Sequence, residues 1–244
     1  MFSFIKGLFK AIIVLLVVVL LVLGYMGFVP GLSSLFGADK PRDLGVVYGA
    51  EDFGSWVEKS GVKFETLPAD ATGKDSLKFS GVVAIDDSFT SEEISANLNQ
   101  SKWKYYPVSR TQVKIHEDGT VEAAGILRTD RLASYAAVQG LSGEEQEVLD
   151  KYLKYVPNNP PFYIRGGVVV RDNKVELDIS EARLGRVAAP QRILGDAEMI
   201  AAVESFIEDR LNFVPNLHLN SLNFEGGKMN VDGTYPAVQS HAKD

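Results

Sequence analysis

The stretch TQVKIHEDGTVEAAGILR, residues 111–128, decides the fold class of this chain. Thr111, Val113 and Ile115 alternate with polar residues, as the buried face of a half-exposed strand does. Asp118-Gly119 is a preferred two-residue hairpin turn, and the alternation resumes after it. The stretch therefore predicts a long antiparallel hairpin. The buried face of its returning strand is expected to consist of Val121, Ala123, Gly125 and Leu127.

The segment before this hairpin predicts a well-defined helix start. Thr90 and Glu93 form a T-x-x-E capping box, in which each side chain accepts a hydrogen bond from the backbone of the other residue. Phe89 and Ile94 stand at the two positions of the matching hydrophobic staple. We therefore expect a helix that follows a strand directly and packs one apolar side against it.

The same hairpin and helix patterns recur along the chain, and they predict an α+β fold. Long hairpins alternating with amphipathic helices favour a curved antiparallel sheet packed with helices over a parallel βαβ sheet. The remaining expected elements are a helix over 51–60, a strand over 77–85, a helix over 142–156 with its own capping box, a hairpin over 162–179, a helix from near 196 to near 215, and a hairpin over 217–235.

Residues 11–36 carry no charged side chain, and this predicts a membrane anchor at the N-terminus. Residues 11–29 supply 19 largely apolar positions, close to the ~20 that cross a bilayer as a helix. Lys6 and Lys10 precede the segment, so the positive-inside tendency predicts a cytoplasmic N-terminus and an extracytoplasmic domain. A cleaved signal peptide is the alternative. Its apolar core would be unusually long, and Phe36 stands where a small residue is needed.

The predicted organisation is thus a single-pass protein of the cell membrane. Its parts are a cytoplasmic N-terminus at 1–10, a transmembrane helix at 11–29, a juxtamembrane linker at 30–43, an extracytoplasmic domain at 44–236 and a loose tail at 237–244. Residues 39–244 contain 23 Lys and Arg against 32 Asp and Glu, which argues against a nucleic-acid partner. The chain has no cysteine, so disulfides, thiolate metal sites and thiol catalysis are excluded.

No motif in the sequence predicts catalysis. His116, His218 and His241 are isolated and do not have the H-E-x-x-H spacing of a zinc site. A G-x-S-x-G elbow, a P-loop and a G-x-G-x-x-G loop are all absent from the sequence. We therefore expect a protein that is not an enzyme and that has no catalytic residues, no cofactor and no metal ligands.

Four segments together resemble bacterial envelope proteins of the tubular lipid-binding (TULIP-like) superfamily, particularly small members with an N-terminal anchor. These segments are SFTSEEISANLN at 88–99, residues 111–128, KVELDISEARLGRVAAPQRI at 174–193 and NLHLNSLNFEGGKMNVDGTYP at 216–236. The resemblance covers roughly residues 75 to 236 and rests on the order of elements and an L-G-x-x-x-x-P segment. It implies a curved sheet around long helices, with an apolar groove for acyl chains.

The resemblance predicts a membrane lipid or another hydrophobic molecule as the ligand. Candidate groove residues, each of which could equally be ordinary core, are Val113, Ile115, Val175, Leu177, Ile179, Ile200, Val203, Ile207 and Leu211. Candidate residues for contact with the membrane interface, where aromatic rings are favoured, are Trp103, Tyr105 and Tyr106. The alternative function is a structural or assembly subunit that joins a membrane-protein partner through its span and an exposed sheet edge or helix face.

Overall fold

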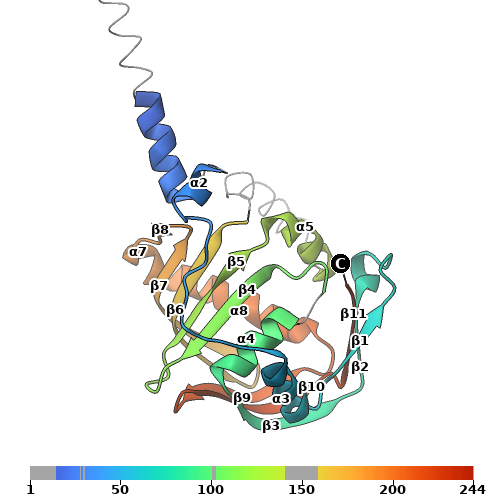
Figure 1. Ribbon diagram of the computed structural model, residues 1–244. Coiled ribbons are helices and arrows are strands. Elements are labelled where there is room, and N and C mark those ends of the chain that lie inside the picture. The colour runs from blue at the N-terminus through green and yellow to red at the C-terminus, as the bar shows by residue number, and fades with distance from the viewer. Residues whose placement is uncertain (1–14, 28, 30, 101–102, 141–158, 244) are drawn as a thin grey trace, which may run out of the picture.

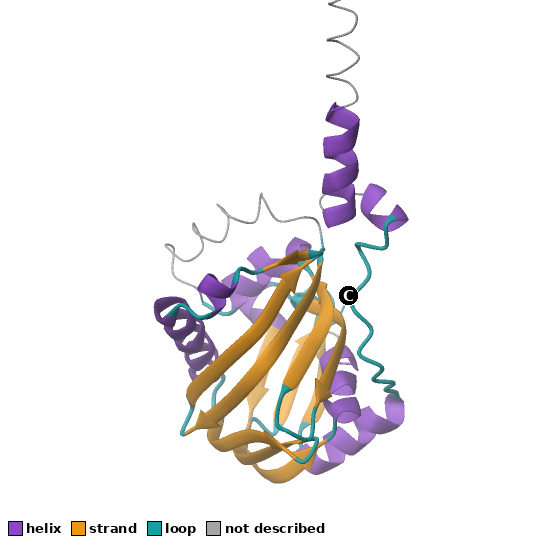
Figure 2. Ribbon diagram, turned by 90° about the vertical axis from the view of Figure 1, so that its left-hand side faces the viewer, coloured by secondary structure: helices purple, strands orange, loops and turns teal. Residues whose placement is uncertain are grey.

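The structure is a computed structural model that describes residues 15–27, 29, 31–100, 103–140 and 159–243. It confirms the α+β class: a strongly curled antiparallel sheet forms a half-barrel, and helices lie along its edges and across its open side (Figure 1). A helix over residues 15–26 extends away from one end of the half-barrel (Figure 2). Within these described residues, no helix is both long enough and apolar enough to cross a membrane.

The large sheet has eight strands, and six of them follow the order β3-β10-β9-β6-β5-β4. Strand β7 pairs with β6 and with the short strand β8. The three predicted hairpins are present as β4–β5, β6–β7 and β9–β10. The strand bounds are β3 Val83–Phe89, β4 Val108–Ile115, β5 Val121–Leu127, β6 Pro161–Arg171, β7 Lys174–Leu184, β8 Val187–Ala188, β9 His218–Glu225 and β10 Lys228–Tyr235.

A second, three-stranded sheet has the order β1-β11-β2, formed by Lys63–Leu67, Val238–Ala242 and Leu77–Ser80. The expectation of a loose tail at 237–244 is therefore wrong for residues 238–242, which form the central strand. Five residues pair with β1 in parallel, and four also pair with β2. The predicted strand at 77–85 is also divided between the two sheets, because Gly81 adopts a positive φ of 65° that a strand does not allow.

The helices confirm most of the predicted helix positions. Their bounds are α2 Leu32–Leu35, α3 Ala50–Ser60, α4 Ser91–Gln100, α5 Thr129–Val138, α7 Gln191–Leu194 and α8 Ala197–Phe213, with a 3-10 turn η1 at Gly73–Ser76. Gly61 ends α3 in the left-handed conformation, and the Asp196 carboxylate caps α8 by accepting from the N–H groups of Glu198 and Met199. The helix predicted over 142–156 lies outside the described residues.

Strand β6 is the branch point of the large sheet. Its first half pairs with β5 at residues 161–166, and its far end pairs with β9 at Val170 and Arg171. A bulge in the pairing with β7 falls between Arg165 and Gly166. A Cβ atom at Gly166 would lie 2.1 Å from the carbonyl oxygen of Asp178, so only glycine fits there. Arg165 pairs with Glu181 and Gly166 pairs with Ile179, so the extra residue of the bulge is Ser180 on β7. A bulge of this kind increases the local twist of the strand pair.

Helix α4 covers the edge of the sheet formed by β4. The Oγ atoms of Ser91 and Ser95 accept from the backbone N–H groups of Ile115 and Val113, each at 2.9 Å. One turn further along the helix, the Asn99 amide accepts from the Thr111 N–H at 3.0 Å and donates to its carbonyl at 2.7 Å. Side chains four residues apart on the helix therefore accept hydrogen bonds from backbone N–H groups two residues apart along the edge of β4.

Helix α8 covers the opposite edge, formed by β7, in the same way. Glu208 accepts from the N–H of Val175 at 3.0 Å, and Glu204 accepts from the N–H of Leu177 at 2.8 Å. The ammonium group of Lys174 also donates to Glu208 at 2.6 Å. Two open edges of the half-barrel, β4 and β7, thus have part of their hydrogen-bonding capacity used by helices.

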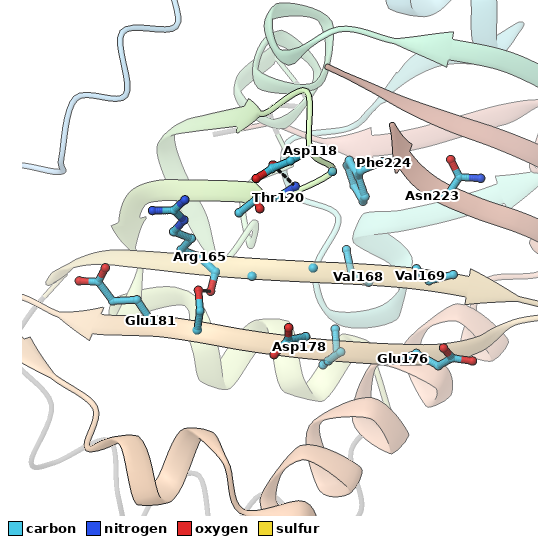
Figure 3. A pocket seen from close by; sticks show the side chains of 15 residues that line it. Asp118, Thr120, Arg165, Val168, Val169, Glu176, Asp178, Glu181, Asn223 and Phe224 are labelled. Atoms are coloured by element: carbon cyan, nitrogen blue, oxygen red, sulfur yellow. Dashed lines mark hydrogen bonds between the residues drawn. The ribbon is translucent and has the colours of Figure 1, made fainter. Parts of the chain in front are cut away.

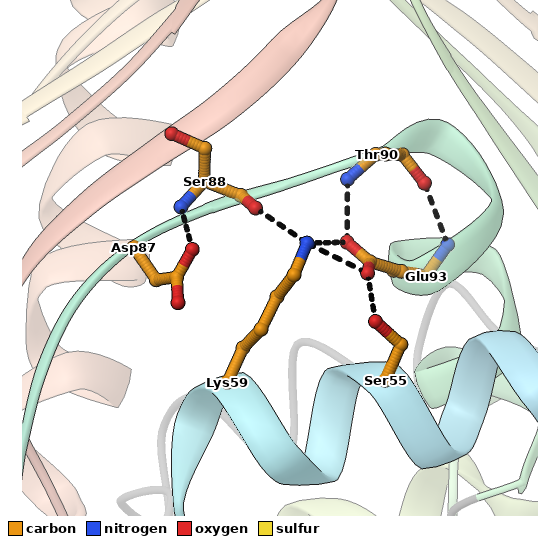
Figure 4. Close-up of polar contacts among 6 residues, drawn as sticks. All are labelled: Ser55, Lys59, Asp87, Ser88, Thr90 and Glu93. Carbon is orange, nitrogen blue, oxygen red and sulfur yellow. Dashed lines mark hydrogen bonds and ion pairs between the residues drawn. The ribbon is translucent and has the colours of Figure 1, made fainter.

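The predicted capping box at Thr90 and Glu93 is confirmed, and it also joins two helices (Figure 4). The Glu93 carboxylate accepts from the Thr90 N–H at 2.9 Å, and the Glu93 N–H donates to Thr90 Oγ1 at 3.3 Å. From α3, the Ser55 hydroxyl and the Lys59 ammonium also donate to this carboxylate. Burial alone would raise the pKa of Glu93, but these donors outweigh it and hold the pKa below its usual value.

The main core lies inside the half-barrel, where the predicted staple residues Phe89 and Ile94 take part in it. Its buried members are Trp56, Val62, Ile85, Phe89, Val170, Val175, Leu217, Leu219 and Val231. The outer face of the sheet is covered as well, since Leu44 and Val46 pack on Ala124 and Tyr163. The expectation for the buried face of β5 is therefore partly wrong, because Gly125 is buried but Val121, Ala123 and Leu127 are only half-buried. Glu122, Ala124 and Ile126, on its other face, are buried too.

The bulge in β7, which lies opposite Gly166 of β6, provides a test of the fold. Gly166→Ala should lower the free energy of unfolding by about 1 to 3 kcal/mol, because its Cβ clashes with the backbone of β7. Gly167→Ala is the matched control, since nothing lies within 4 Å of a Cβ at that position. The control should change stability by no more than about 0.5 kcal/mol. Urea unfolding of both variants measures the difference, and equal losses would contradict the bulge assignment.

The low pKa of Glu93 gives the fold a defined pH dependence. A carboxyl whose pKa is lower in the folded state stabilises the fold above its unfolded-state pKa, and this stabilisation is lost as pH falls through the folded-state pKa. Glu93→Gln should therefore cost about 2 kcal/mol at neutral pH. The difference from the unchanged protein should shrink below about pH 4.5, measured by urea unfolding at several pH values. A pH-independent difference would contradict this role of the ionised carboxylate.

Candidate functional site

An apolar pocket opens on the inner face of the half-barrel, at the end nearest the helix over residues 15–26. Its volume is about 600 Å³, and nearly all of its surface is hydrocarbon. Ile164 remains 43% exposed and Ile193 39% exposed at its wall. The lining residues are Val108, Leu127, Phe162, Ile164, Ala182, Arg183, Leu184, Val187, Ala188, Ala189, Pro190 and Ile193.

The inner face of β6 explains why this pocket forms. Phe162, Ile164, Val168 and Val170 lie at alternate positions and point to the same side of the sheet. Val170 and Val168 belong to the main core and its surroundings, where α8 contributes Ile207 and Leu211. Phe162 and Ile164 lie beyond this core and line the pocket. The pocket is therefore the unfilled end of the same apolar surface that forms the core.

The segment LGRVAAP, residues 184–190, builds the rim of the apolar pocket. Gly185, at a φ of 59°, turns the chain from β7 into the short strand β8. Pro190 then precedes helix α7, which brings Ile193 to the pocket wall. The sequence showed this segment as a break in periodicity, and it gave no sign that the break would form a rim.

A second pocket of about 390 Å³ borders the first and has the opposite character. Its charged lining residues are all cations, namely Lys40, Arg42, Arg183 and Arg186. The other lining residues are Pro161, Phe162, Tyr163 and Gly185. Phe162 and Arg183 line both pockets. Neighbouring strand residues point to opposite faces, so Phe162 faces the apolar pocket inside the half-barrel, whereas Tyr163 and Arg183 face the cationic pocket outside it. The two pockets therefore meet at the end of the sheet where β6 begins and β7 ends.

The turn between β7 and β8 also docks against the end of the N-terminal helix. The Arg186 N–H donates to the Met26 carbonyl at 3.4 Å, and its guanidinium donates to the Phe36 carbonyl. The same guanidinium lies 4.2 Å from the centre of the Tyr25 ring. Both pockets therefore lie beside the point where the apolar helix ends.

A buried polar network lies under the outer covering segment. The Glu122 carboxylate accepts from the Tyr163 hydroxyl at 2.7 Å and lies 2.7 Å from His116 Nε2. Burial and the hydrogen bond to Glu122 raise the pKa of Tyr163 to about 12, so the phenol stays protonated. The Arg42 guanidinium lies 4.3 Å above the same ring. This network holds Arg42 against the outer face of the sheet.

A third pocket, of about 850 Å³, lies where β5 and β9 diverge from β6 (Figure 3). Its lining includes Asp118, Arg165, Asp178 and Glu181, which come from the β4–β5 turn and from β6 and β7. Among the described residues, no group of three or more histidines and carboxylates is placed to bind a metal ion. The polar wall of this pocket is the outward face of β6 and β7, and we assign it no chemistry.

The predicted groove residues lie beside the apolar pocket rather than around it. Val175, Leu177, Ile207 and Leu211 take part in the main core. Val113 and Ile115 are buried on β4, and Ile179, Ile200 and Val203 are half-buried on β7 and α8. The residues that do line the pocket were missed, although Ile164 follows the same alternation and was within reach of the sequence pattern.

The predicted membrane-interface residues form a packing cluster. Trp103 is 4% exposed, its ring centre lies 5.8 Å from that of Tyr105, and its indole N–H donates to Ser76 Oγ at 3.1 Å. Burial raises the pKa of Tyr106 well above its usual value. In this conformation the cluster joins the segment before β4 to the small sheet, where Trp103 also bridges to Lys243.

Comparison with known proteins finds no matching family model, no matching curated protein and no matching solved structure. The functional argument therefore rests on the two adjacent pockets and their position beside the helix over residues 15–26.

The burial of Trp103 predicts that it does not contact lipid. In the Trp56→Phe variant, Trp103 is the only tryptophan of the chain. With the full chain in vesicles that contain brominated phosphatidylcholine, we expect less than about 10% quenching of its emission, because a buried ring is shielded from the acyl chains. Adding Tyr25→Trp supplies an exposed reporter at the end of the N-terminal helix. Strong quenching without this second change would contradict the packing role.

Proposed function

We propose that this protein binds the acyl chains of a membrane lipid in its inner apolar pocket and supports lipid handling in the cell envelope. The single observation that carries the proposal is the position of the pocket, which opens beside the end of the N-terminal apolar helix. A volume of about 600 Å³ is in the usual range of ligand pockets. Each methylene moved from water into it contributes about 0.8 kcal/mol.

The proposal includes the predicted span at 11–29, with the N-terminus in the cytoplasm and the domain outside. Residues 15–26 are helical, and 11–14 of the span lie outside the described residues. The side chains of this helix are exposed along most of its length, as those of a lipid-facing helix would be. If this helix enters a bilayer, its contact with Arg186 holds the pocket mouth near the bilayer surface.

The alternative function, a structural or assembly subunit, has less support. That function would use an exposed sheet edge or helix face to bind a membrane-protein partner. In the described part of the chain, α4 and α8 supply side-chain partners to β4 and β7. Those two strands are therefore poorly suited to pair with a further strand. Met199 and Phe206 on α8 are exposed and remain available to a partner under this alternative.

The test is photo-crosslinking of the full chain in phosphatidylcholine vesicles that contain a phospholipid with a diazirine in its acyl chain. We expect crosslinks on peptides that contain Phe162, Ile164 or Ile193. Ile164→Trp should reduce them about tenfold, as a loss of roughly 1.4 kcal/mol of contact would. Because the Ile164 side chain is 43% exposed, the free energy of unfolding of the Ile164→Trp variant should differ from that of the unchanged protein by less than about 0.5 kcal/mol.

Val82→Trp is the matched control, since Val82 is 60% exposed and lies away from the pocket. It should leave the crosslinking yield unchanged. Crosslinks confined to residues 15–26, with none in the pocket, would contradict the proposal.

A further inference from the structure

We propose that the cationic pocket binds the phosphate-containing headgroup of an anionic lipid whose acyl chains enter the adjacent apolar pocket. This inference rests on the proposed function and specifies its ligand class. Arg183 and Phe162 line both pockets at the end of the sheet, so a single lipid that passes over this end can place its headgroup in the outer, cationic pocket and its chains in the inner, apolar pocket. The shared chemistry of the ligand is a phosphate group, which either a lipid or free phosphate could supply.

The charge of this pocket stands out against the rest of the molecule. The whole chain has a formal net charge of −7, yet the four charged residues lining the pocket are all cations. Lys40 and Arg42 come from the segment after the N-terminal helix, and Arg183 and Arg186 come from the β7–β8 region. Glu181 neutralises part of this charge through its ion pair with Arg183 at 2.5 Å. An excess of positive charge remains at the other three positions.

Two of the guanidinium groups are held in place by aromatic rings. Arg42 lies 4.3 Å over the ring of Tyr163, and Arg186 lies 4.2 Å over the ring of Tyr25. An arginine stacked in this way uses its face for the ring and keeps N–H groups in its plane for a planar or tetrahedral anion. Arg186 uses one of these groups for the Phe36 carbonyl and retains others. This arrangement suits charge-assisted hydrogen bonds to phosphate oxygens.

The position of the pocket favours a lipid headgroup over a free anion. Arg186 contacts Met26, the last residue of the apolar helix, and Phe36, which ends α2. The cationic pocket would therefore lie at the level of the headgroups if the apolar helix enters a bilayer. A soluble phosphate would gain nothing from the hydrocarbon wall that begins at Phe162. A lipid has a charged headgroup for the cationic pocket and acyl chains for the apolar pocket. Binding of one part therefore raises the effective concentration of the other part at its own pocket.

The experiment places two photoreactive lipids in the same vesicles, one a phosphatidylglycerol and the other a phosphatidylcholine, with the full chain reconstituted. We expect the anionic probe to label the apolar-pocket peptides about fivefold more than the zwitterionic probe, as one favourable cation contact would give. Arg42→Gln and Lys40→Gln should each move this ratio toward one. The Lys40 side chain makes no hydrogen bond or ion pair to another described residue, and its backbone N–H bond to Gly37 does not depend on the side chain, so the Lys40→Gln variant should keep the fold intact.

Arg171→Gln is the control for a general loss of positive charge, because Arg171 is exposed at the opposite end of the β6–β7 hairpin. It should leave the ratio unchanged. Equal labelling by both probes would overturn the headgroup inference and leave the proposed function intact, whereas absence of pocket labelling by either probe would overturn the proposed function. Loss of the preference on adding millimolar inorganic phosphate, but not chloride of the same ionic strength, would assign the pocket to free phosphate.

Discussion

Hydrogen-bond satisfaction at two open sheet edges is the constraint on which this half-barrel depends. A barrel that closes has no edges, but this sheet ends at β3 and β4, and β7 adds a further edge beside β6. Strands β4 and β7 therefore leave backbone groups facing outward. Four helical residues rise about 6 Å, and two strand residues span about 6.7 Å. Side chains one turn apart on a helix can therefore follow the outward N–H groups of a strand. Ser91, Ser95 and Asn99 do this on α4, and Glu204 and Glu208 do it on α8.

This arrangement also explains why part of the interior is open. Helix α8 is positioned by its carboxylates along the β7 edge, so it fills the half-barrel where Ile207 and Leu211 reach the core. Helix α8 carries no fully buried residue, and none of its residues lines the pocket beside the first residues of β6. The apolar surface of β6 continues past the end of the core, because the alternation of Phe162 and Ile164 matches that of Val168 and Val170. Core and pocket are two parts of one continuous strand face.

Local patterns in the sequence predicted much of this fold, and contacts between distant segments account for what they missed. The capping box at Glu93 and the turn at Asp118-Gly119 depend on residues within a few positions of each other, so both could be read directly. The strand at 238–242 is specified by its pairing with β1 and β2, more than 150 residues earlier, and it has little periodicity of its own. The same holds for the site. Apolar alternation indicated an apolar interior, but the adjacency of Arg42 and Arg186 exists only in the folded chain.

The segment between the N-terminal helix and the domain has a consequence for the lifetime of the protein. A connection between an apolar helix and a folded domain is commonly an exposed stalk, and exposed stalks are where proteases cut and release ectodomains. Here Leu44 and Val46 are buried on the outer face of the sheet, and the Leu44 N–H donates to the Gln112 side chain at 2.6 Å. A protease needs an extended, accessible backbone, so cleavage at these residues would first require peeling the segment from the sheet. The fold itself therefore protects the chain against cleavage at this position.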